Sequence, residues 1–215
     1  MSENIVRTLA QHYDALVRKH GDAPEASQWS DRDTQFRRFA VLAGIAPDLA
    51  VSSILDLGCG TGALLTFLNE HVGFNGSYTG LDISPEAIKV ARQNHPEARF
   101  LHHDLLTSTL DEYFDYVMIS GIFNNKMKDE ETCMQYLQDI LTKAFGLARK
   151  GMAFNAMSKY VDYEDENLCY FQPEDIVSFC KKKLSSCVTL RHDYRVKDNV
   201  IPFEFTMYIY KDGKA

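Results

Sequence analysis

The 215-residue sequence lacks several features that define other classes of protein. No segment approaches the roughly 18 consecutive apolar residues that a membrane-spanning helix needs. The N-terminus has no basic segment followed by an apolar one, as a secretory signal has. Basic residues form no dense run apart from 181–183, and the net charge of −7 argues against a nucleic-acid partner. These absences predict a cytoplasmic protein without membrane or nucleic-acid partners, and they leave its oligomeric state open.

Cysteine is scarce, and familiar metal or nucleophile motifs are missing. The five cysteines are odd in number and not closely paired, which favours a reducing compartment over a disulfide framework. His102, His103 and Asp104 are adjacent and look like metal ligands, but neighbouring residues of a strand point to opposite faces. No second cluster has zinc spacing, and the hydrolase pattern Gly-x-Ser-x-Gly is absent. We therefore expect no metal site and no serine hydrolase.

Strand and helix patterns alternate along the chain. Apolar residues recur at helical spacing over 5–20 and again over 36–42. Strands are expected over 51–57, 78–83, 98–103, 114–120, 151–157, 186–194 and 202–211, with helices over 63–72, from 85, over 130–149 and over 173–184. This order predicts an α/β fold: a doubly wound, mostly parallel seven-stranded sheet with an antiparallel C-terminal edge strand. We expect one domain over 1–215, with an N-terminal helical cap over 1–48 and the sheet core over 49–215.

The most informative segment is 54–62, where an apolar strand breaks into a glycine-rich turn before a helix. Glycine tolerates the positive φ angles and the close ligand approach that such a turn requires, and the free N–H groups of the next helix suit an anionic ligand group. The glycines alone also fit a dinucleotide fingerprint. Asp56, two residues before Gly58, and a second carboxylate at Asp82 separate the two interpretations.

Asp-Leu-Gly-Cys-Gly-Thr-Gly at 56–62 resembles motif I of the Rossmann-like methyltransferases that depend on S-adenosylmethionine (SAM). The segment 80–84 resembles the family's second strand, and the resemblance implies that its terminal Asp82 holds the ribose hydroxyls. The segment 100–105 resembles the third strand, and the resemblance implies that Asp104 meets the adenine amino group. SAM is therefore the expected cofactor, with NAD or another nucleotide as the alternative.

In such a fold ligands bind beyond the carboxyl ends of the strands. An aspartate at one strand end is common in turns and helix caps, but acids at three successive strand ends favour a binding site. Two aromatic residues of the cap are consistent either with covering the cofactor or with packing against the sheet. The predicted cofactor-binding residues are Tyr13, Trp29, Asp56, Gly58, Gly60, Gly62, Asp82, Ile83, Asp104, Leu105 and Ser120.

The candidate catalytic residues are Asn124, Tyr160 and His192. Asn124 follows the fourth strand, where this family usually places substrate-contacting groups; its amide is no base near neutrality, and bonding to its own loop is the alternative. Tyr160 follows the fifth strand, where an aromatic face stabilises a nearby positive charge; packing is the alternative. His192 has an ordinary pKa near neutrality and suits a base, with a satisfied surface histidine as the alternative.

The sequence predicts a SAM-dependent methyltransferase that acts on a small molecule. Methyl transfer is an in-line displacement at an already activated carbon, so alignment worth about 7–11 kcal/mol can replace a strong base. Segments around 155–162, 190–194 and 204–206 resemble a bacterial branch of SAM enzymes associated with secondary metabolism or surface polysaccharides. That branch is similar to enzymes that cyclise SAM to azetidine-2-carboxylate and methylthioadenosine. Cyclisation and SAM binding without catalysis therefore remain alternative functions.

Overall fold

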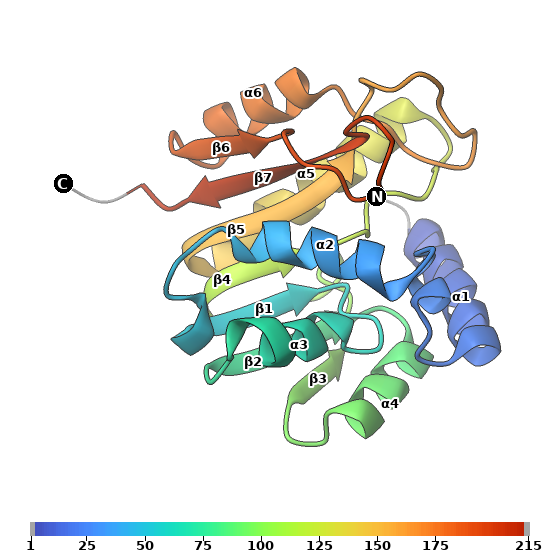
Figure 1. Cartoon of the computed structure of the whole chain (residues 1–215), viewed down its shortest axis with the longest axis vertical. Coiled ribbons are helices and arrows are strands. Elements are labelled where there is room, and N and C mark those ends of the chain that lie inside the picture. The colour runs from blue at the N-terminus through green and yellow to red at the C-terminus, as the bar shows by residue number, and fades with distance from the viewer. Residues whose placement is uncertain (1–2, 213–215) are drawn as a thin grey trace.

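The computed structural model describes residues 3–212, and a seven-stranded sheet runs through its centre (Figure 1). The sheet order is β3-β2-β1-β4-β5-β7-β6. Strands β1 to β5 pair in parallel, and β7 pairs antiparallel with both β5 and β6. The strands are β1 Ser53–Leu57, β2 Ser77–Asp82, β3 Arg99–His102, β4 Phe114–Ile119, β5 Ala148–Met157, β6 Val188–Arg191 and β7 Glu204–Tyr210. The predicted doubly wound α/β fold is confirmed, with the antiparallel strand β7 inserted beside the edge strand β6.

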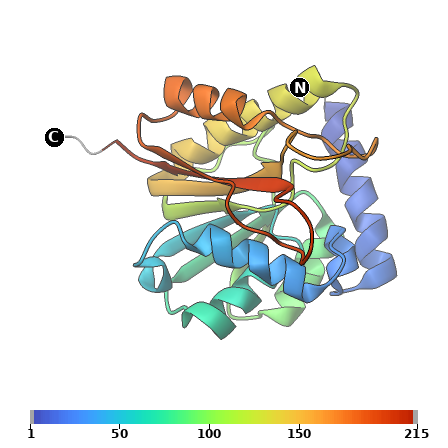
Figure 2. The same cartoon turned by 45° about the horizontal axis from the view of Figure 1, so that its top comes forward.

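Helices cover both faces of the sheet, and one helix covers its end. The helices are α1 Glu3–His20, α2 Arg32–Ala43, α3 Ala63–Phe67, α4 Pro85–Asn94, α5 Glu130–Leu147 and α6 Pro173–Lys183, with short helical turns η1 Pro24–Ser27, η2 Leu49–Val51 and η3 Leu68–Val72. Helices α2, α3 and α4 pack on one face and α5 and α6 on the other. In Figure 2, α1 stands upright across the end of the sheet while α2 and α6 lie along its two faces.

Helix starts follow local sequence signals. Ser84 accepts a hydrogen bond from the backbone N–H of Ala87 at 3.1 Å, and Pro85 occupies the first position of α4, as expected from the sequence. Asp31 caps α2 and Asp129 caps α5 in the same way. Two apolar layers then form on the two faces of the sheet, one centred on α5 and one on α2 and α3. These contacts hold the carboxyl ends of the parallel strands in register at the end covered by α1.

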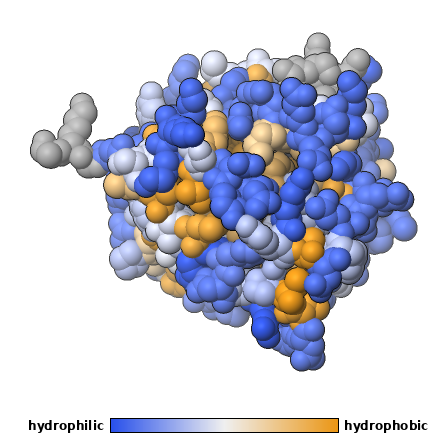
Figure 3. Space-filling view, turned by 90° about the horizontal axis from the view of Figure 1, so that it is seen from above, coloured by the Kyte–Doolittle hydropathy of each residue, from blue (hydrophilic) through white to orange (hydrophobic). Residues whose placement is uncertain are grey.

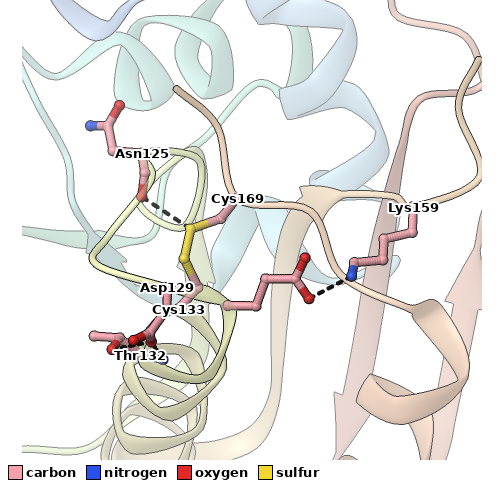
Figure 4. Close-up of a disulfide and its surroundings, with 7 residues drawn as sticks. Asn125, Asp129, Thr132, Cys133, Lys159 and Cys169 are labelled. Atoms are coloured by element: carbon pink, nitrogen blue, oxygen red, sulfur yellow. Dashed lines mark hydrogen bonds and ion pairs between the residues drawn. A yellow bond between two sulfur atoms is a disulfide. The ribbon is translucent and has the colours of Figure 1, made fainter. Parts of the chain in front are cut away.

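The expectation about cysteine is wrong for one pair. Cys133 in the first turn of α5 and Cys169 in the segment 158–172 form a disulfide (Figure 4). The two cysteines are 36 residues apart in sequence, so spacing gave no signal, and the fold alone brings them together. The disulfide joins α5 to the connection between β5 and α6.

The surface is largely hydrophilic on the face seen in Figure 3, where hydrophobic residues gather only in small patches. Among the described residues, no helix is long and apolar enough to cross a membrane. Within residues 3–212, no group of three or more His, Cys, Asp or Glu side chains is arranged to hold a metal ion. The imidazoles of His102 and His103 lie in different surroundings, as expected for neighbours in a strand. His102 forms a hydrogen bond with the backbone oxygen of Ile83 at 3.1 Å, whereas His103 lines a cavity at the end of the sheet.

Candidate functional site

A cavity lies between α1 and the carboxyl ends of β1 to β4, and we call it the first cavity. Its walls include α1, the glycine-rich turn after β1 and the segments after β2, β3 and β4. All the predicted cofactor-binding residues except Gly62 line it: Tyr13, Trp29, Asp56, Gly58, Gly60, Asp82, Ile83, Asp104, Leu105 and Ser120. Gly62 instead caps α3 and lies against the ring of His95. The role of these residues in binding a cofactor stays a prediction.

The glycine turn is held by the neighbouring strand. The N–H groups of Gly58 and Cys59 donate to the backbone oxygen of Leu81 at 2.8 and 3.0 Å. Gly58 has φ +80°, and a Cβ placed there would lie 2.1 Å from Cγ2 of Ile122. Only glycine fits this position, because a side chain would be both strained and overlapped.

Two acids line the cavity, the buried Asp56 and the half-buried Asp82. Asp82 accepts hydrogen bonds from the backbone N–H of Gly60 and of Ser84, each at 2.8 Å. Burial raises the pKa of Asp82, and these backbone donors oppose that shift. Burial also raises the pKa of Asp56 to about 7, although the hydroxyl of Tyr78 donates to its carboxylate at 2.5 Å. The cavity thus holds one carboxyl that titrates near neutrality.

Asp104 lines the cavity and also stabilises a turn, which was the alternative role expected for an aspartate at a strand end. Its Oδ1 accepts from the N–H of Leu106 and its Oδ2 from the hydroxyl of Thr107, both at 2.8 Å. Asp104 therefore caps the turn after β3, and it lines the first cavity as well.

Two polar atoms in this wall lack partners. Among the described residues, Oγ of Ser120 and Nε2 of His103 are buried and make no hydrogen bond. Buried polar atoms are rarely left unpaired, so these two suit a ligand with hydroxyl, amine or carboxylate groups. A SAM molecule carries all three kinds of group, and the residues of the first cavity fit it.

Helix α1, which covers the first cavity, forms a hydrogen bond with the segment after β4. The amide of Asn125 donates to the hydroxyl of Tyr13 at 2.7 Å. Burial raises the pKa of the Tyr13 phenol far above its ordinary value, with the nearby charge of Asp82 adding to the shift. Tyr13 is therefore a neutral hydroxyl that ties α1 to this segment.

A second cavity of about 520 Å³ adjoins the first. Ser27, Trp29 and Gly121 line both. The Trp29 ring packs on Gly121, whose N–H donates to the side-chain oxygen of Asn155 at 3.1 Å. Asn124 lines the second cavity, and its side chain has no hydrogen-bond partner among the described residues. The structure thus brings Asn124 close to the shared wall.

Tyr160 and His192 line neither cavity. The Tyr160 side chain is 51% exposed, and its hydroxyl donates to Glu174 and accepts from Gln172. His192 lies beside it, with ring centroids 6.1 Å apart. Tyr160 and His192 form a separate group away from both cavities, in which Tyr160 is exposed and His192 is half-buried, with its Nε2 buried and unpartnered among the described residues. Their catalytic role stays a prediction.

Sequence reasoning missed most of the second cavity. Arg38, Lys197, Phe203 and Tyr170 line it and come from three separate segments. One signal was available for Arg38: it lies on the buried face of α2 at helical spacing with Gln35 and Leu42. An arginine on an apolar stripe needs a buried partner or a ligand. The loops 158–172 and 192–203 carried no such signal.

The match to known families decides the class of this chain. Residues 50–189 match the model of a methyltransferase domain family. The chain belongs to this methyltransferase family. A protein of Mycobacterium tuberculosis named as a methyltransferase is 36% identical over 163 residues, which is 74% of this chain and 93% of that protein. The predicted class, a SAM-dependent methyltransferase, is confirmed.

Solved structures share the fold of this methyltransferase. Magnesium protoporphyrin IX methyltransferase from Synechocystis PCC 6803, with bound SAM, superposes with a TM-score of 0.67 at 15% identity and covers 96% of this chain and 97% of its own. A SAM-dependent methyltransferase from Clostridium acetobutylicum has a TM-score of 0.59 at 15% identity and covers 96% and 99%. At this identity the likeness concerns the fold alone.

Proposed function

We propose that this methyltransferase holds SAM in the first cavity and transfers its methyl group to a small molecule held in the second. The observation that carries the proposal is the shared wall of Ser27, Trp29 and Gly121 between the two cavities. In-line displacement needs a donor and an acceptor on opposite sides of one carbon atom. Two adjoining cavities with a common wall meet that need.

Within the first cavity, we assign the ribose hydroxyls to Asp82. Each of its carboxylate oxygens already accepts one backbone N–H, from Gly60 or Ser84, and retains a second lone pair. The backbone bonds fix the orientation of the carboxylate before any ligand arrives. Ser120 and His103 supply the polar atoms without partners, and Asp104 faces the same cavity beyond Asp82.

The proposed reaction requires the protein mainly to orient the acceptor and does not require a strong base. Bound SAM would supply a methyl group on a cationic sulfur, already activated for displacement. The residues of the shared wall orient the acceptor and exclude water, and the free amide of Asn124 is placed to hold it. Alignment of this kind is worth about 7–11 kcal/mol. The proposed reaction centre does not include Tyr160 or His192, because neither lines a cavity.

The test is a product analysis by mass spectrometry with SAM alone and with SAM plus a library of small metabolites. We expect S-adenosylhomocysteine, and a product in which a methyl group replaces one hydrogen of the acceptor, only when an acceptor is present. Methylthioadenosine released from SAM alone would establish the cyclase instead. SAM that binds and is never turned over would establish a binding protein.

A variant separates the two cavities in the same assay. Asn124→Ala is expected to lower kcat about tenfold or more while the Kd for SAM stays nearly unchanged, because its amide lines only the second cavity. Asn75→Ala, which removes an exposed amide that bonds Gly73 away from both cavities, is the matched control. Loss of SAM affinity in Asn124→Ala would assign Asn124 to the cofactor.

A further inference from the structure

The proposed methyl transfer leaves the acceptor undefined, and the second cavity contains one buried cation that bears on it. Resting on that proposed function, we propose that the acceptor carries a carboxylate group that Arg38 binds. Arg38 lies on α2, lines the second cavity and is only 4% exposed. Its guanidinium is held in the wall by hydrogen bonds to Glu204 and to the backbone of Thr34.

The protein uses only part of the hydrogen-bonding capacity of Arg38. Its Nε donates to Glu204 at 2.9 Å and its Nη1 to the backbone oxygen of Thr34 at 2.8 Å. Within the described part of the chain, Nη2 has no partner. A guanidinium has five N–H donors in one plane, so N–H groups remain for a ligand. Their fork geometry matches a carboxylate.

The guanidinium of Arg38 lies over two aromatic rings. Its guanidinium lies 4.1 Å from the ring centroid of Trp29 and 5.9 Å from that of Phe203. Trp29 lines both cavities. A carboxylate bound by Arg38 would therefore sit near the shared wall, and aromatic and aliphatic side chains of the second cavity, such as Phe203 and Ile201, would contact an apolar body behind it.

The acidic residues of the second cavity do not reverse this preference. Asp162 and Asp165 also line it, but both are exposed, and water and salt screen exposed charges. Oδ1 of Asp165 is already occupied by the backbone N–H and the amide of Asn167. Arg38 acts from a buried position, where the lower effective dielectric strengthens its interactions several-fold.

Charge balance points to Lys197. Glu204 already compensates the charge of Arg38, and Arg38 opposes the rise that burial causes in the pKa of Glu204. Lys197 lines the same cavity and is exposed, so its charge is screened as those of the two exposed acids are, and it adds a weaker attraction for an anion. Its charge also acts on Asp31. The acceptor predicted by this arrangement is a small apolar or aromatic carboxylic acid.

The experiment measures binding of matched acids and amides to the protein saturated with S-adenosylhomocysteine. The probes are benzoate, cinnamate and indole-3-acetate, each paired with its primary amide, and calorimetry gives the Kd of each. We expect the acids to bind about tenfold or more tightly than the amides, as charge-assisted hydrogen bonds require. Arg38→Gln/Glu204→Gln, which neutralises both members of the buried pair together, should remove this difference while amide binding persists. Lys197→Gln should reduce it about threefold.

The matched control is Arg99→Gln/Glu112→Gln, which neutralises an exposed pair with contacts of 2.6 and 2.7 Å that lines neither cavity. Its preference for acids should equal that of the wild type. Equal affinity for acids and amides, binding of neither, or tighter binding of the corresponding amines would overturn the carboxylate proposal. Failure of S-adenosylhomocysteine itself to bind would instead count against the proposed function. If the double variant at Arg38 does not fold, the Lys197→Gln result and the wild-type series still decide.

Discussion

The two cavities meet at Trp29 and Gly121, yet their walls are built in different ways. The first cavity is formed by the ends of neighbouring parallel strands, whose spacing is set by the ladder of backbone hydrogen bonds. The second is formed by α2 and two long loops, 158–172 and 192–203, which are joined to the rest of the molecule by side-chain contacts, a few isolated backbone hydrogen bonds and one disulfide. Changes to the second wall need not disturb the sheet, whereas changes to the first alter the sheet directly.

Backbone hydrogen bonds and the disulfide attach the loop 158–172 to the segment after β4. The N–H of Cys169 donates to the backbone oxygen of Asn124 at 2.7 Å, and the N–H of Lys126 donates to that of Asn167 at 2.9 Å. The sulfur of Cys169 lies 3.2 Å from the backbone oxygen of Asn125, as Figure 4 shows. The disulfide therefore secures the segment that carries Asn124 as well as the loop 158–172.

The largest expected effect comes from a substitution in the wall of the first cavity. Gly58→Ala should lower the free energy of unfolding by about 2–5 kcal/mol, since it combines a positive φ with overlap against Ile122. SAM binding should fall with it. Gly73→Ala is the control, because Gly73 has φ +67° but open space around it, and should cost only about 1–2 kcal/mol. Urea unfolding measures both, and equal losses in the two variants would refute the steric argument.

The next effect belongs to the loop-built side. Cys133→Ala/Cys169→Ala should lower the free energy of unfolding by about 2–4 kcal/mol, because it frees a long loop in the unfolded chain. It should also raise the KM for the acceptor while the Kd for SAM stays unchanged. Cys187→Ala, an exposed free cysteine, is the control. A loss of SAM affinity equal to the loss for the acceptor would erase the distinction between the two walls.

A smaller effect concerns Asp82, the residue proposed to bind the ribose hydroxyls. Asp82→Asn should weaken SAM binding by about 1.5–3 kcal/mol, as charge-assisted bonds to the ribose hydroxyls are lost. The asparagine oxygen can still accept the N–H of Gly60 or of Ser84, but its NH2 group cannot accept the other, so the fold of the variant must be checked. Titration calorimetry measures the affinity and thermal unfolding checks the fold. An unchanged Kd in a folded variant would remove Asp82 from the binding site.

The smallest effect depends on pH. The pKa of Asp56 is raised by burial to about 7, so its carboxyl is mostly neutral below that pH and ionised above it. Because SAM carries a positive sulfonium, its affinity should rise about threefold to tenfold between pH 6 and pH 8. Asp56→Asn supplies the control, since it keeps the titration of the ligand and removes that of the carboxyl. The same rise in wild type and variant would show that Asp56 has no part in it.

The difference between the walls explains how far the sequence could be read. The motif 56–62 and the acids at 82 and 104 could be recognised from the sequence. Strand ends and glycine turns are local patterns, and the candidate ligand-binding groups lie within them. The second wall has no such pattern: Arg38 and Phe203 are 165 positions apart in the chain, and Cys133 and Cys169 meet only after β5 and α5 have packed. Tyr160 shows the same limit, since its place after β5 predicted a location at the cavity, whereas its side chain is exposed and bonds Glu174 and Gln172.

The position of Trp29 has a thermodynamic consequence. Its indole is a wall of both cavities and is held by Arg38 on one side and Gly121 on the other. A ligand that shifted this ring from one cavity would change the shape that the other presents, and the two binding equilibria would then be linked. Linkage is reciprocal: the factor by which SAM altered the affinity for the acceptor would equal the factor by which the acceptor altered the affinity for SAM.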